Sequence, residues 1–67
     1  MQNTSEKLKI MQISKKLLKI FIKDLHLLIR SYNEDSEKFP QVKYHNDKQI
    51  LKMEGKIEAY QNLINHF

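Results

Sequence analysis

The side chains that can do chemistry are few and scattered in this chain of 67 residues. There is no cysteine to serve as a nucleophile or thiolate ligand, and no serine has a histidine and an acid grouped around it. His26, His45 and His66 lie far apart, whereas zinc sites on helices use histidines one turn apart. The sequence therefore predicts a protein that is not an enzyme, with no catalytic residue, no metal and no cofactor.

Positive charge is the most organised chemical feature. Residues 1–32 hold seven basic and two acidic groups, a net charge of +5, while residues 33–46 sum to −1 and residues 47–67 to 0. The basic stripe, spaced at 4, 3, 4, 3 and 4 residues, consists of Gln12, Lys16, Lys19, Lys23, His26 and Arg30, with Lys9 and Lys15 alongside. Like charges at this spacing cost a helix roughly 0.2 to 0.5 kcal/mol per pair, so the stripe does not serve helix stability. Four of its charged residues are predicted to bind an anionic partner: Lys16, Lys19, Lys23 and Arg30.

Three kinds of partner fit the basic stripe: a nucleic-acid backbone, an acidic protein surface and anionic lipid. A fourth interpretation needs no partner, because an A+T-rich gene fills solvated positions with lysine, whose stems cover neighbouring apolar surface. The chain has a single arginine and no group of Arg, Asn or Gln at a helix start for base contacts. These alternatives remain open at the level of sequence.

The elements that position these groups are helices. One glycine and one proline in 67 residues supply too few turns for a sheet protein, which indicates an all-α fold. The first helix is predicted over about residues 4–32. Asn3 and Glu6 have the spacing of a capping box at its start.

A connector is predicted over about residues 33–46, where helical periodicity is lost. Pro40 should push Phe39 out of helical conformation, and part of the connector is expected to pack as a short helical turn. The second helix is predicted over 47–66, with Asn46 as its N-cap.

The second helix carries one apolar row with the spacing of a coiled-coil seam. Its members, separated by 3, 4, 3, 4 and 3 residues, are Ile50, Met53, Ile57, Tyr60, Ile64 and Phe67. This row predicts packing against one other helix.

The first helix is apolar around roughly 260° of its circumference, far more than the ~100° that one partner helix covers. One stripe contains Met11, Leu18, Phe21, Leu25, Leu28 and Tyr32; a second contains Ile10, Ile13, Leu17, Ile20 and Leu27. Leu8, Ile22 and Ile29 widen the apolar arc. The residues expected to form an oligomer or partner interface are Leu17, Leu18, Phe21, Leu25 and Leu28. We therefore expect the hairpin to dimerise into a four-helix bundle, with Asp24 at the edge of the apolar arc.

The functional expectation is a single helical domain over 1–67, located in the cytoplasm. Its apolar window, Leu17–Ile29, would be about 20 Å long, short of the ~30 Å bilayer core. The leading hypothesis is a small regulatory or inhibitory adaptor that binds another protein. The alternatives are a nucleic-acid-binding regulator that uses the basic stripe, and a membrane-surface or bacteriocin-immunity type protein.

Overall fold

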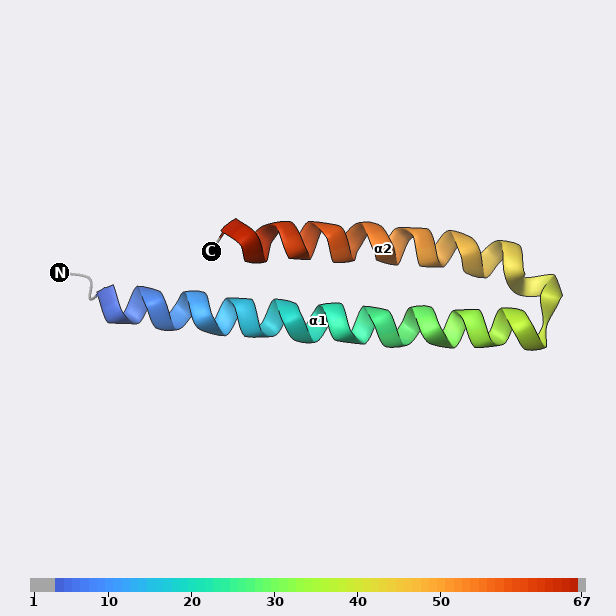
Figure 1. Ribbon diagram of the computed structural model, residues 1–67, viewed down its shortest axis with the longest axis horizontal. Coiled ribbons are helices and arrows are strands. Elements are labelled where there is room, and N and C mark those ends of the chain that lie inside the picture. The colour runs from blue at the N-terminus through green and yellow to red at the C-terminus, as the bar shows by residue number, and fades with distance from the viewer. Residues whose placement is uncertain (1–3, 67) are drawn as a thin grey trace.

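The chain forms an antiparallel helical hairpin (Figure 1). The structure, a computed structural model, describes residues 4–66. It contains α1 (Thr4–Lys38), the short 3₁₀ turn η1 (Pro40–Val42) and α2 (Lys43–His66). The prediction of two helices packed as a hairpin is confirmed. Asn3, the predicted cap of the first helix, and Phe67, the last residue of the predicted seam, lie outside the described residues.

The connector is much shorter than the predicted 33–46. The first helix continues past Tyr32 to Lys38, and the second begins at Lys43 instead of Asp47, so that only residues 39–42 join them. The apolar periodicity ends near Tyr32 because fewer residues there are covered. A helix needs only good helix formers, and Glu34, Glu37 and Lys38 extend it as a polar end.

Pro40 pushes the residue before it out of helical conformation, as predicted, and α1 ends at Lys38. Phe39 leaves the helical region, with φ −130° and ψ 82°, because the proline ring excludes that conformation from its neighbour. The amide of Phe39 still donates to the carbonyl of Asp35 at 2.8 Å, and that of Val42 donates to the carbonyl of Phe39 at 3.0 Å. The predicted short helical turn in the connector is confirmed as η1.

Asn46 is a buried residue inside α2, and its prediction as an N-cap is wrong. Its side chain is 5% exposed, and Nδ2 donates at 3.2 Å to both the carbonyl of Tyr32 and Oγ of Ser36. Oγ of Ser36 in turn donates to the Tyr32 carbonyl at 3.0 Å. These bonds join the two helices next to the connector and satisfy the buried amide.

The same bonds fix which side of α1 faces α2. Stepping back by sevens from Ser36 places Ile29 and Ile22 on the inner side, and both are half-buried. On α2 the inner side has Ile50 and Ile57 buried and Met53, Tyr60 and Ile64 half-buried. The ring of Phe21 approaches that of Tyr60 at 6.1 Å between centroids, at the edge of this contact.

The molecule is a thin rod of 59 × 15 × 13 Å. Its radius of gyration is 16.6 Å, against about 11 Å for a compact chain of this length. The accessible surface is 5736 Å², against about 4500 Å² for a compact monomer of the same mass. Two helices side by side therefore leave about 1200 Å² more surface in water than a compact fold of this size would.

Candidate interaction surface

One side of α1 is apolar and exposed, with only Phe21, at its edge, approaching a side chain of α2. We call it the outer apolar face; its members, 46–60% exposed, are Ile10, Ile13, Leu17, Ile20, Phe21, Leu27 and Leu28. At 100° per residue they fall within an arc of about 120°, so they form one continuous strip. By contrast, Ile50 and Ile57 are the only apolar side chains in the described part of the chain that are buried.

The structure divides the predicted interface residues between two sides of α1. Leu18 and Leu25 are half-buried on the side that faces α2. Leu17, Phe21 and Leu28 lie on the outer apolar face, each 47–48% exposed. The hairpin therefore covers part of the predicted interface and leaves the rest in water.

The first turns of α1 have no helix beside them. Figure 1 shows α1 continuing past the C-terminal end of α2, on the side away from the connector. Leu8 and Ile10 belong to this free part and are 54% and 60% exposed. Ile10 is the first member of the outer apolar face, whereas Leu8 lies on another side of α1, so the free part of α1 exposes apolar side chains on more than one side.

Asp24 lies near the middle of the outer apolar face. Its side chain is exposed, between Ile20 and Leu27 along the strip. The sequence placed this carboxylate at the edge of the apolar arc. Because α2 covers the opposite part of that arc, Asp24 lies at the centre of the apolar surface that stays exposed.

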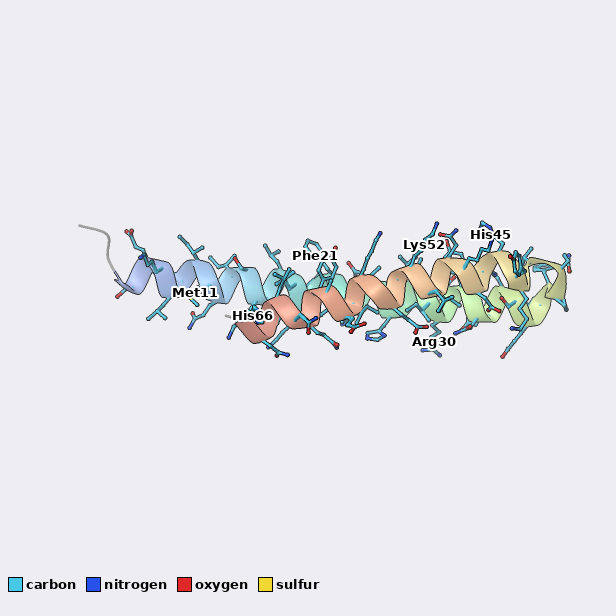
Figure 2. The ribbon with its side chains drawn as sticks, turned by 90° about the horizontal axis from the view of Figure 1, so that it is seen from above. Met11, Phe21, Arg30, His45, Lys52 and His66 are labelled. Carbon is cyan, nitrogen blue, oxygen red and sulfur yellow. The ribbon has the colours of Figure 1, made fainter. Side chains whose placement is uncertain are left out.

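The basic stripe runs along one edge of the outer apolar face of α1. In Figure 2, Phe21 and Arg30 point to opposite sides of the hairpin. Lys16, Lys19, Lys23 and Arg30 are all exposed. Arg30 Nε lies 3.4 Å from Glu34 Oε1, an exposed pair within one helix that contributes little to stability.

Lys15 departs from the stripe that the sequence placed it beside, because it is half-buried. No ion pair joins α1 to α2 within residues 4–66. The lysines of the stripe are therefore not neutralised by the second helix.

The remaining hollow offers no chemistry of its own. It is an open depression beside the connector, lined by Asn33, Ser36, Glu37, Lys43 and Asp47. Nζ of Lys43 donates to Oδ2 of Asp47 at 2.9 Å, and both side chains are at least half exposed. Such a solvated pair lacks the desolvation that tunes a catalytic acid or base.

The described residues contain no group of three or more histidines and acids that is able to hold a metal ion. His26, His45 and His66 are each exposed. Nor does either helix, as far as it is described, have a stretch both long and apolar enough for a bilayer span.

Sequence reasoning missed two features of this surface. It grouped Phe21 and Leu28 in one stripe with Leu18 and Leu25, whereas the half-buried side that faces α2 has Ile22 and Ile29 in their place. The heptad spacing from Ser36 back to Ile22 was the available signal, because a polar residue at one end of an apolar row can mark the buried side. It also treated Asn46 as a cap, although its distance from the seam residue Ile50 is four residues, one helical turn.

Comparisons of this chain with models of protein families, with curated proteins and with solved structures gave no match.

Proposed function

We propose that this chain is a non-enzymatic regulatory or inhibitory adaptor of the cytoplasm that works by protein–protein interaction as a homodimer. The outer apolar face of α1 is the observation that carries the proposal. Seven large apolar side chains there are 46–60% exposed, a continuous strip of the kind that marks an interaction site.

A second copy is the occupant that the surface area favours. The rod exposes about 1200 Å² more than a compact monomer of its mass, and a standard interface removes about 800 Å² per partner. Two hairpins joined through α1 make four helices in which α1 is central. The dimer removes the excess surface without any further protein.

The basic stripe is then the recognition surface for the target. It borders the outer apolar face along one edge, and of its cations Lys19 lies farthest from that face, so it stays in water when a second copy covers the face. Lys16, Lys19, Lys23 and Arg30 would meet carboxylates on an acidic protein.

Light scattering after gel filtration tests the assembly. Wild type should elute at twice 8.1 kDa at micromolar concentration, and Leu17→Gln should shift the equilibrium toward monomer because it places an amide in the interface. Leu51→Gln is the matched control, since Leu51 is 68% exposed on α2, away from the outer apolar face. A monomeric wild type would contradict the homodimer.

Nucleic acid is the second candidate target, favoured by the uninterrupted length of the basic stripe. Phosphate contacts predict retention on RNA that weakens steeply with salt and is lost in the triple variant K16E/K19E/K23E, which is compared with wild type only where light scattering gives both the same oligomeric state. The triple variant K48E/K52E/K56E on α2 is the matched control. Retention of wild type by an acidic protein surface but not by RNA supports the adaptor.

A lipid surface is the least favoured partner. Asp24, central in the outer apolar face, would have to leave water to enter the acyl region. Sedimentation with anionic vesicles tests this class, and we expect the protein to remain in the supernatant.

A further inference from the structure

The outer apolar face contains its own coiled-coil row, distinct from the one that packs on α2. At spacings of 3, 4, 3, 4 and 3, the row consists of Ile10, Ile13, Leu17, Ile20, Asp24 and Leu27. Five of these are apolar and 46–60% exposed, and Asp24 is exposed as well. This spacing is that of a helix that packs lengthwise on a second helix.

The two flanks of the row differ in chemistry. One flank, repeating every seven residues, is Lys9, Lys16, Lys23 and Arg30, and all four are exposed. The other flank is Ser14, Phe21, Leu28 and Asp35. The way these flanks meet depends on the direction of the second helix, because antiparallel helices bring like flanks together and parallel helices bring unlike flanks together.

An antiparallel second copy is opposed by charge. The antiparallel register that covers the whole row pairs Ile10 with Leu27, Ile13 with Asp24, and Leu17 with Ile20. In that register Lys16 meets Lys23 of the second copy, and Lys9 meets its Arg30. Two-fold symmetry repeats both contacts, so four pairs of like charge line one side of the interface.

A parallel second copy has one like-charge contact, between the two Asp24 carboxylates, against four in the antiparallel register, and Lys23 lies beside each of these carboxylates. Lys16 and Lys23 then extend along Phe21 and Leu28 of the second copy, covering them with their stems while the ammonium groups reach water. Arg30 meets Asp35 of the second copy, a pair of opposite charge. The basic flank thus covers apolar surface that α2 leaves open.

Asp24 is the polar residue that holds the parallel register. The two Asp24 carboxylates lie at the same level, and the hole that receives each of them includes Lys23 of the second copy. A shift by one heptad would place the Asp24 carboxylate of one chain against Leu17 and that of the other chain against Ser31, and would separate both from Lys23. A single polar residue in a coiled-coil row is the best-attested device for setting register.

We infer that the second copy lies parallel to the first, α1 along α1, with Asp24 of both chains at one level. This alignment rests on the homodimer proposed above. It gives Asp24 and Lys23 a role in selecting the partner helix and its alignment. Both side chains lie at the interface between copies, and neither makes a contact that one hairpin alone requires.

Disulfide cross-linking tests the alignment cleanly, because the natural chain has no cysteine. The single variants I13C and L27C should each form a covalent dimer with themselves on mild oxidation, since equal positions of the row face each other. L51C, on α2, is the control and should remain mostly uncross-linked. Circular dichroism of each variant before oxidation checks that the helices are retained.

An equimolar mixture of I10C with L27C tests for the antiparallel alignment, in which these two positions face each other. An antiparallel dimer would yield mainly the mixed product and little self-linked I13C, which would overturn the alignment while leaving the homodimer intact. A wild-type monomer by light scattering would overturn the homodimer and the alignment together. Adding D24L to I13C removes the register residue, and we expect less self-linked product, because copies shifted by one heptad hold the two cysteines too far apart to join.

Discussion

Asn46 is a buried polar side chain. Two hydrogen bonds to α1 offset the free-energy cost of removing its amide group from water. Replacing it with alanine removes both bonds from Nδ2 and leaves a small void beside the connector. We expect Asn46→Ala to lower the free energy of unfolding by about 1 to 3 kcal/mol.

Urea denaturation measures this change against Asn62→Ala, an exposed asparagine on the same helix. Both variants gain the same helix propensity, so the difference between them isolates the buried bonds. Equal urea midpoints for the two variants would show that Asn46 contributes no specific bond.

Gly55 sits in the middle of α2 without any close neighbour. A Cβ built on it meets no atom within 4 Å, so alanine fits without displacing anything. Gly55→Ala should therefore raise the free energy of unfolding by about 1 kcal/mol through helix propensity.

The reverse change, Ala59→Gly on an exposed turn of the same helix, should lower that free energy by a similar amount. Thermal unfolding followed by circular dichroism compares the two. A loss of stability in Gly55→Ala would mean that another helix packs on this side of α2.

At the scale of the element, α1 carries like charges that lower the stability of its own helix. Lys15, Lys19 and Lys23 are spaced by four residues, and Lys19→Glu turns two like-charge neighbours into two attractive ones. At about 0.2 to 0.5 kcal/mol for each repulsion removed and for each attraction gained, we expect this variant to be more stable by roughly 0.8 to 2 kcal/mol at low salt.

Lys19→Gln, which only removes the repulsion, should give about half of the gain. Urea denaturation at low and high salt checks both variants, and the gain should shrink as salt screens the charges. A gain that persists unchanged at high salt would rule out an electrostatic origin.

The helices were predictable from sequence because their causes are local. Composition excluded sheets, Pro40 determined where α1 ends, and the spacing of Ile50 and Ile57 indicated the packed side of α2. The connector was predicted too long because its limits were drawn where apolar periodicity faded. Periodicity reports burial, and a helix with a polar end continues without it.

The side of α1 that meets α2 could not be predicted because nearly every side of α1 is apolar. The rotation of such a helix about its own axis is determined by a contact with another element. Here that contact is Asn46 with Ser36 and the Tyr32 carbonyl, ten and fourteen residues away in sequence. The outer apolar face and the central place of Asp24 follow from this choice of rotation.

At the scale of the whole molecule, the thin rod links stability to concentration. If the folded state is a dimer and the unfolded state is a monomer, a tenfold rise in protein concentration adds about 1.4 kcal/mol per mole of dimer. We expect the midpoint of thermal unfolding to rise with concentration for wild type and for Leu51→Gln. Leu17→Gln should lose this dependence, and a wild-type midpoint independent of concentration would contradict a dimeric folded state.

The uncovered first turns of α1 determine where local opening of the hairpin begins. The chain is tied at the connector and by Asn46, so opening starts at the other end, and amide hydrogen exchange should slow steadily from Ile10 toward Ser36. Those first turns, which α2 does not reach, would exchange almost as fast as an isolated peptide. Protection that appears there only as the protein is concentrated would give, residue by residue, the length of α1 over which two copies touch.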